Sequence, residues 1–310
     1  MTTQEIKKPH IAVFHYSQTG QLTSLLNSLT TPLESMGCRV TYKDITPKIP
    51  FGFPWSEQDF YESFPESRLE IPAEVEQIDF SDVMDADLVI LGYQPWFLAP
   101  SIPFASFLRE ESVRSYLSGR GVLTVVGSRN MWTSAHLSVG ERLKEYGCSW
   151  VANIALEDRH NNLIGVLTVF RWLIKGQKSA SRFLPEAGIS DADIKSVATI
   201  APAIFDALSS GEWGSLQKEI VERGLVQFHP GLYFVESNGN RLWGKWAQFV
   251  IKKGGTKDPR RAFRLKLFKY YLNFVIFAVS PFGSLFFVLT YPLRYKGLRK
   301  IGQKILFLQS

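Results

Sequence analysis

Blocks of apolar and polar residues along the first 30 positions predict a strand followed by a helix. Ile11–Phe14 is a continuous apolar run, which is typical of a strand buried on both faces. Polar residues occupy positions 17–21, and apolar residues then return at helical spacing, at Leu22, Leu25, Leu26 and Leu29. The pattern therefore predicts a strand, a tight turn and a helix in direct succession.

The same alternation continues through the first two thirds of the chain. Further strands are predicted at 39–45, 87–93, 121–127 and 150–156. Helices are predicted at 103–117, 135–146 and 191–208, and a long insertion with an apolar stretch lies at 157–188. Alternating strands and helices predict an α/β fold, with a parallel sheet covered by helices on both faces.

Three polar or aromatic loops follow predicted strands directly, at 17–21, 93–101 and 128–132. In open sheets of this kind, ligands bind beyond the carboxyl ends of the strands, where the strand order switches. We therefore expect these three loops to meet at one crevice.

The loop at 17–21 has the chemistry of a phosphate site. Unpaired N–H groups and the helix dipole favour an anion at a helix N-terminus, and Gly20 permits close backbone approach. Ser17 and Thr19 add hydroxyl donors, whereas the turn contains no Lys or Arg. It matches neither a Walker loop nor a dinucleotide fingerprint. The alternative is that Ser17 or Thr19 merely caps the helix.

The two aromatic loops predict a site for a planar ring. Aromatic faces at Trp96 and Trp132 would stack on a conjugated ring system and exclude water from it. Turn N–H groups would reach the pyrimidine edge of that ring, and Arg129 would stabilise a reduced anion there. A phosphate and such a ring together describe flavin mononucleotide (FMN). The alternative is that both tryptophans serve only in packing.

Charge is distributed unevenly along the 310 residues. From Lys252 onward there are thirteen Lys and Arg residues and one acid, Asp258, so this segment carries +12 and residues 1–251 carry −6. Cys38 and Cys148 fit no metal or redox spacing, and the first ten residues lack the apolar core of a signal peptide. We therefore expect a reducing, cytosolic environment and no metal.

The basic C-terminal segment contains a stretch, 270–293, without a charged residue. A helix of that length would span about 36 Å, enough to cross a bilayer. Pro281-Phe282-Gly283 predicts a break in its middle, and basic flanks on both sides favour a shallow hairpin or two interfacial helices. Leu298, Ile301, Ile305 and Leu308 then form the apolar stripe of a basic amphipathic helix. We expect an anionic membrane surface as partner rather than nucleic acid; a buried helix pair is the alternative.

Residues 10–210 resemble the flavodoxin-like fold, which implies a doubly wound, five-stranded parallel sheet of order 2-1-3-4-5. Ser17-Gln18-Thr19-Gly20 is similar to the FMN phosphate loop of that fold, and the segments 93–101 and 127–132 are similar to its second and third flavin loops. Leu22 stands where electron carriers usually have Thr, which favours an enzyme. The resemblance implies an FMN site formed by Ser17, Gln18, Thr19, Gly20, Gln21, Leu22, Gln94, Pro95, Trp96, Phe97, Gly127, Ser128, Arg129, Asn130 and Trp132.

The motifs HYSQTGQL and SRNMW, together with the apolar basic tail, resemble more narrowly the dialkylresorcinol condensing enzyme/aromatase family (DarA) of flexirubin-type pathways. This resemblance implies FMN-dependent aromatisation of a 2,5-dialkylcyclohexane-1,3-dione supplied by a ketosynthase partner. His160, His136 and Tyr93 are the candidates for the base or for polarising a ring oxygen. A membrane-associated NAD(P)H:quinone reductase and a tethered flavodoxin electron carrier are the alternatives.

These observations divide the chain into three predicted parts. Residues 1–211 form the FMN-binding domain, 212–259 link it to the tail or cap the crevice, and 260–310 form the membrane-associating helical tail. The predicted location is the cytoplasmic face of the inner membrane, in peripheral or monotopic form. We also consider a homodimer.

Overall fold

A computed structural model of the chain describes residues 8–308. Its centre is a parallel sheet in the order β2-β1-β3-β6-β7. The five strands are β1 (His10–His15), β2 (Arg39–Asp44), β3 (Leu88–Tyr93), β6 (Gly121–Ser128) and β7 (Ser149–Glu157). All six residues of β1 and of β3 are buried, as expected for central strands covered on both faces. The predicted flavodoxin-like fold, with strand order 2-1-3-4-5, is confirmed.

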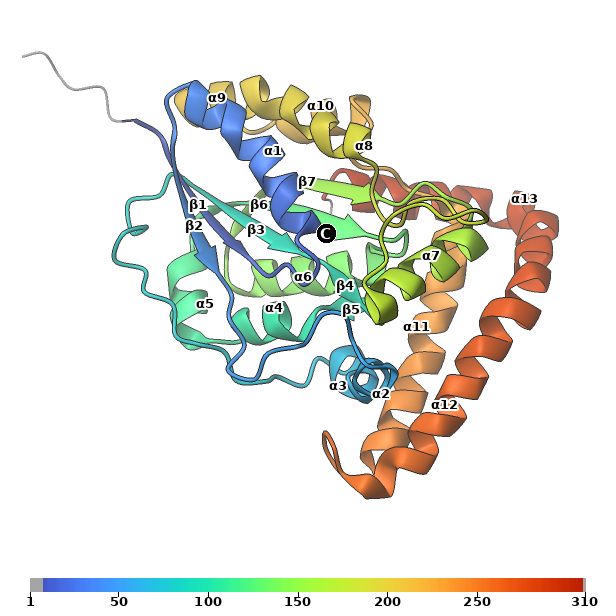
Figure 1. Cartoon of the computed structure of the whole chain (residues 1–310). Helices are drawn as coiled ribbons and strands as arrows, with labels where there is room; N and C mark the ends of the chain where they lie inside the picture. The colour runs from blue at the N-terminus through green and yellow to red at the C-terminus, as the bar shows by residue number, and fades with distance from the viewer. Residues whose placement is uncertain (1–7, 309–310) are drawn as a thin grey trace, which may run out of the picture.

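Helices cover both faces of this sheet (Figure 1). One face carries α1 (Gln21–Ser35), α8 (Asp191–Ser196), η1 (Val197–Ile200), α9 (Ala201–Ser210) and α10 (Leu216–Glu222). The other face carries α4 (Ile102–Phe107), α5 (Glu111–Leu117) and α6 (Thr133–Glu145). The single helix predicted at 103–117 is therefore two helices, because Glu110 takes an extended conformation between them.

The insertion after β7 and the segment after β2 both lie near the carboxyl ends of the strands. The insertion forms α7 (Asn162–Lys175), and the segment after β2 forms α2 (Glu57–Glu62) and α3 (Phe64–Arg68). The loop after β3 contains a two-stranded hairpin, β4 (Pro95–Trp96) and β5 (Ala99–Pro100). These elements surround the edge of the sheet at which the predicted ligand loops end.

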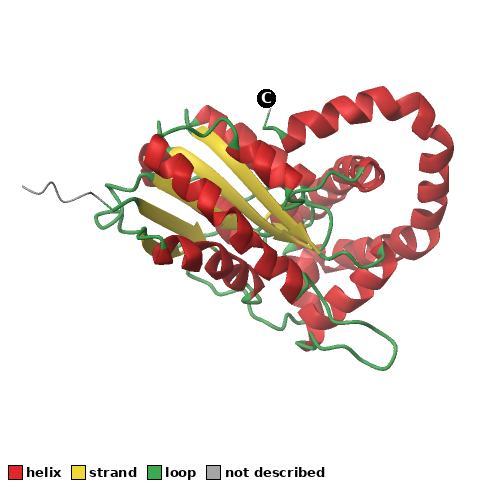
Figure 2. Cartoon of the chain, turned by 90° about the horizontal axis from the view of Figure 1, so that it is seen from above, coloured by secondary structure: helices red, strands yellow, loops and turns green. Residues whose placement is uncertain are grey.

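The C-terminal quarter is helical and packs against this edge. It consists of α11 (Pro230–Ile251), η2 (Pro259–Arg261), α12 (Ala262–Phe274), the π-helix η3 (Val275–Val279) and α13 (Ser280–Leu306). Figure 2 shows the last helices following a wide arc that returns toward the sheet. No helix within residues 8–308 combines the length and apolarity needed to cross a bilayer.

Two expectations for the tail are wrong. The chain does not leave the helical conformation at Pro281-Phe282-Gly283, because Pro281 lies in the first turn of α13 and the π-helix precedes it. The stripe on the last turns does not face outward either. Ile305 belongs to the main core, Leu298 is buried, and Gln217 Nε2 donates to the Leu306 carbonyl at 2.7 Å. The end of α13 therefore packs on the α/β unit.

Candidate functional site

The turn after β1 presents weakly engaged backbone donors at the start of α1. Gly20 has φ +80°, a left-handed conformation that favours glycine, and it places Gln21 at the first position of the helix. Thr19 Oγ1 lies 3.4 Å from the Gln21 nitrogen, and Ser17 Oγ lies 3.4 Å from the Thr23 nitrogen. Both distances exceed the usual 2.7–3.2 Å of N–H···O bonds. These N–H groups are therefore available to a stronger acceptor such as phosphate.

The neighbouring side chains hold the turn in place. Gln21 exchanges hydrogen bonds with the backbone of Ile189, at 3.0 and 3.1 Å, and Leu22 is buried in the core. Gln18 donates to the Gly52 carbonyl at 3.2 Å, while its Oε1 is buried without a partner in the described chain. Gln18 and Gln21 therefore hold the turn against the backbone of Gly52 and Ile189.

A cavity of about 290 Å³ opens beside this turn, lined by Thr19, Gly20 and Gln21. Lys178 and Lys195 line the same cavity, although the turn itself has no basic residue. Sequence reasoning missed both lysines, because they lie more than 150 positions away and belong to no motif. Lys178 Nζ pairs with Glu186 at 2.9 Å and Asp191 also lines the cavity, so Lys195 is the lysine that would add to the anion-attracting field of the α1 N-terminus.

A second cavity, of about 420 Å³, lies over the aromatic loop and is largely apolar. Its volume lies within the range of about 300–1,000 Å³ that is usual for small-molecule sites. Pro95, Trp96, Phe97 and Leu98 line one side, and residues of α7 and of the tail helices line the other. Phe97 and Leu98 have φ values of +47° and +66°. Bulky side chains rarely adopt such angles, and strain of this kind concentrates at functional sites.

Arg129 alone among the described lining residues of this cavity carries a charge. Its Nη1 donates to Asn162 Oδ1 at 2.7 Å and to the Asn162 carbonyl at 3.2 Å, and no carboxylate of the described chain is bonded to it. Burial lowers the pKa of Arg129 to about 10, and the charge of Asp158 opposes that shift. Arg129 is thus a cation at neutral pH at the wall of an apolar cavity. Such a group stabilises negative charge that forms nearby.

The structure separates the remaining residues predicted for the ring site. Ser128 lines the cavity with Arg129, and its Oγ is buried without a partner in the described residues. Gln94 accepts a hydrogen bond from the Ser101 nitrogen at the base of the hairpin, and Gly127 is half-buried. Asn130 instead lines a third cavity. The expected slot between Trp96 and Trp132 does not form, because Trp132 is buried edge-on against His136.

The three catalytic candidates are not brought together. Tyr93 is fully buried and stacks on Phe104, and its hydroxyl has no partner in the described chain. His136 is buried between Trp132 and Trp150, and burial lowers its pKa to about 3. Neither residue lines the cavities described above. His160 is more exposed and lines the third cavity, with Nδ1 2.5 Å from Asp158 Oδ1.

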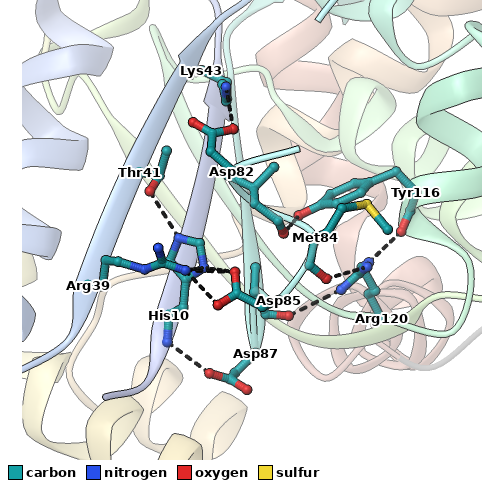
Figure 3. Close-up of polar contacts among 12 residues, drawn as sticks. His10, Arg39, Thr41, Lys43, Asp82, Met84, Asp85, Asp87, Tyr116 and Arg120 are labelled. Carbon is teal, nitrogen blue, oxygen red and sulfur yellow. Dashed lines mark hydrogen bonds and ion pairs between the residues drawn. The ribbon is translucent and has the colours of Figure 1, made fainter. Parts of the chain in front are cut away.

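A polar network also lies at the opposite edge of the sheet (Figure 3). His10 at the start of β1 is fully buried, with Nδ1 2.8 Å from Asp85 Oδ1 and Nε2 2.9 Å from Thr41 Oγ1. Arg39 contacts the same carboxylate at 2.6 Å. Ligands of this fold bind at the carboxyl ends of the strands, whereas this network joins their amino ends. We therefore assign it to holding β1, β2 and the segment before β3 together.

Comparisons with known proteins give similar folds at low sequence identity. No family model matches the chain, and no curated protein matches it. Among solved structures, a flavodoxin from the domain Archaea covers 64% of this chain and 99% of its own, with 10% identity and a TM-score of 0.38. A putative flavoprotein from Bacteroides eggerthii covers 54% and 98%, with 16% identity and a TM-score of 0.39. A flavoprotein in complex with FMN from Lactobacillus acidophilus covers 48% and 91%, with 17% identity and a TM-score of 0.32.

Proposed function

We propose that this chain is an FMN-dependent oxidoreductase, and that it aromatises a 2,5-dialkylcyclohexane-1,3-dione to a dialkylresorcinol together with a ketosynthase partner. The observation that carries the redox part is Arg129, a cation at the wall of an apolar cavity with no bonded carboxylate in the described chain. The narrower substrate assignment follows from the motif resemblance.

The residues present fit FMN at both ends. The weakly engaged N–H groups of Gln21 and Thr23, with Lys195 beside them, would hold the phosphate. Trp96 and the strained hairpin residues Phe97 and Leu98 would cover the ring and exclude water. When bound, FMN supplies a hydride acceptor, which is what the removal of two electrons and two protons from the dione requires.

The chain's own charged groups support the remaining steps. Arg129 would stabilise negative charge on the reduced ring or on an enolate oxygen in the apolar cavity. Of the predicted bases, His160 is the accessible one, with Nδ1 held by Asp158, but it lines the third cavity and not the apolar cavity of Arg129, so it is not placed to act as the base there. The residues that line the cavity are mostly apolar, which favours an apolar substrate over the docking of a polar protein surface at the flavin edge.

We also propose that the tail places this cavity at an anionic membrane surface on the cytoplasmic side. The helices η3 and α13 expose several large apolar side chains, including Phe277, Phe282, Leu285, Leu289 and Leu293. Phe277 also lines the apolar cavity, so the cavity opens at this surface. Lys and Arg residues flank the surface in the sequence on both sides. Alkylated substrate and product would thus enter and leave through the lipid interface.

Flavin content is the first test of this proposal. Gly20→Val should remove flavin from the purified full chain, because the side chain obstructs the phosphate turn. Gly37→Val is the matched control, since Gly37 also has positive φ and open space around it but lies at the other end of α1. Equal flavin content in both variants would contradict the phosphate site.

Turnover is the second test. The wild-type protein should convert a synthetic dialkylcyclohexanedione to the resorcinol with dioxygen or a supplied dye as final electron acceptor, without NADPH. Strict dependence on NADPH with quinone consumption would establish the quinone reductase instead. Bound flavin without turnover of either substrate would favour the electron carrier.

A further inference from the structure

The third cavity has a polar wall and an apolar wall. It encloses about 570 Å³ at the carboxyl end of β7, against α11 and α13. Glu157, Asp158 and His160 contribute to the polar side, while Leu232 and Phe287 contribute to the apolar side. Its size is that of a small-molecule site.

Two histidine–carboxylate pairs line the polar wall. Asp158 is completely buried, and its Oδ1 accepts from both Nδ1 and the backbone nitrogen of His160, at 2.5 and 2.9 Å. His229 Nε2 contacts Glu157 Oε1. One nitrogen of each imidazole is thus held by a carboxylate. The other nitrogen, Nε2 of His160 and Nδ1 of His229, makes no hydrogen bond within the described chain.

Two buried acceptors in the same wall also lack partners. Asn130 is 7% exposed, and its Oδ1 has no hydrogen-bond partner in the described residues. The same is true of Glu157 Oε2. Leaving buried acceptors unsatisfied costs about 1–3 kcal/mol each, so such atoms indicate a missing donor. A ligand with hydroxyl groups supplies donors of this kind.

The apolar wall continues onto the molecular surface. Val288 lines the cavity and is 65% exposed, and its neighbours Phe286 and Leu289 are also exposed. An alkyl chain attached to a hydroxylated head would therefore follow α13 outward and remain in contact with apolar side chains.

We propose that this cavity binds the hydroxyl-bearing head of an amphipathic molecule, held by His160, His229, Asn130 and Glu157, with its alkyl chain along α13. The hydrogen bond that His229 donates to Glu157 raises the pKa of His229, so His229 Nδ1 donates when the ring is protonated and accepts when it is neutral. The site is separate from the apolar cavity that holds Arg129, because Asn162 bonds both Arg129 and Asn130 between the two. The inference does not depend on FMN.

Binding of 5-pentylresorcinol to the full chain tests this site, with pentylbenzene as the ligand that lacks hydroxyls. Histidine ring signals in the NMR spectrum report the contact. We expect saturable shifts of the His160 and His229 signals with the resorcinol. Pentylbenzene should bind at least about tenfold more weakly, which corresponds to about 1.4 kcal/mol of binding free energy. Equal binding of the two ligands would overturn the proposal.

Two variants test the named residues. The double variant His160→Phe, His229→Phe keeps two rings and removes their nitrogens, and Asn130→Leu removes one unpaired acceptor at similar volume. Each should weaken resorcinol binding about tenfold or more. Asn238→Leu, an exposed change on α11, should leave it unchanged. Unchanged binding in both test variants would refute the site. Flavin content is measured in parallel. A wild-type protein that lacks flavin but binds resorcinol through these residues would contradict the redox proposal and support this site.

Discussion

Arg261 Nη1 lies 2.5 Å from Glu66 Oε1, and Nη2 lies 2.9 Å from Glu66 Oε2, in a bidentate pair that joins residues 195 positions apart. The Arg261 side chain is fully buried, and its Nη2 also lies 2.9 Å from Glu62 Oε2. Beside it, Phe268 of α12 stacks on Phe64 of α3, with ring centroids 3.5 Å apart. The start of the tail is therefore held to the segment after β2.

Replacing Arg261 should destabilise the fold strongly. Arg261→Ala leaves two buried carboxylates without their cation, and breaking such a pair costs about 3–5 kcal/mol. The neighbouring Arg260 is 74% exposed and pairs with Asp258, so Arg260→Ala should cost only about 0–1 kcal/mol. Urea unfolding of both variants measures the difference. Equal losses would show that the buried pair contributes no more than an exposed one.

Glu236 should stabilise α6 from a different helix. The N-cap of α6 is Trp132, whose side chain makes no capping bond, and Glu236 on α11 occupies that role. Its carboxylate accepts from Thr133 Oγ1 at 2.5 Å and from the Ser134 nitrogen at 2.6 Å. Glu236→Ala should lower the free energy of unfolding by about 2–3 kcal/mol, and Glu236→Gln by less, because an amide oxygen remains.

The control for this prediction is Glu222→Ala on α10. Glu222 is exposed and lies 3.7 Å from Lys218, so its loss should change stability by less than about 0.5 kcal/mol. A Glu236→Ala variant as stable as the control would mean that solvent replaces the cap.

The sheet was predictable because its signals are local. Apolar runs such as Ile11–Phe14 and 88–91 are continuous, since central parallel strands are buried on both faces. The helical tail was harder to predict. Ile305 has the spacing of a lipid-facing stripe, yet it packs in the core, because an apolar helix face cannot reveal from sequence alone what covers it.

Site residues in the loops that directly follow strands were predictable from the sequence, whereas site residues contributed by distant segments were not. Gly20 and Arg129 lie in loops next to strands, so their placement at the carboxyl edge follows from the topology. Lys178 and His229 line cavities at the same edge, but they lie in later segments that match no motif, so the sequence did not single them out. Trp132 shows the opposite case: a large aromatic residue in a loop was as compatible with core packing as with a ligand.

His136 should make the fold sensitive to mild acid. Burial lowers its pKa from 6.5 to about 3, so below pH 6.5 the unfolded chain binds a proton that the folded chain excludes. Stability from this group is full above pH 6.5 and falls by about 1.4 kcal/mol per pH unit toward pH 3. Between pH 7.5 and 5.0 the loss is about 2 kcal/mol, and His136→Leu should remove it.

The pH experiment compares urea midpoints of the wild type and the variant at both pH values. His229 provides a control of opposite sign, because its raised pKa gives stability below pH 6.5 that is lost as pH rises. His229→Phe should therefore steepen the acid loss slightly. An unchanged acid loss in His136→Leu would mean that other groups cause it.

The exposed apolar side chains of α13 should drive membrane binding. Phe282, Leu289 and Leu293 are 70–90% exposed, and changing all three to Ser leaves the buried contacts of Arg261 and Ile305 in place. Binding to vesicles with anionic lipid should weaken at least about 1,000-fold, since each of the three side chains contributes about 1.5–3 kcal/mol when fully buried. The control changes Ile49, Met84 and Phe183 to Ser, which are 57–85% exposed elsewhere on the molecule. Equal losses in both triple variants would contradict a defined membrane face.

Arg129 should set the reduction potential of the proposed flavin. A cation beside the ring favours the negative charge of the reduced form, so Arg129→Gln should lower the two-electron potential by about 30 mV, equivalent to about 1.4 kcal/mol. Arg129→Lys should restore most of the shift if charge is what matters. Arg171→Gln is the matched control, because Arg171 lies on α7 and bonds Gln177 and Ser179 in an exposed position. If Arg129→Gln still binds flavin and its reduction potential is unchanged, the guanidinium lies too far from the ring to act on it. Its role is then limited to the hydrogen bonds with Asn162.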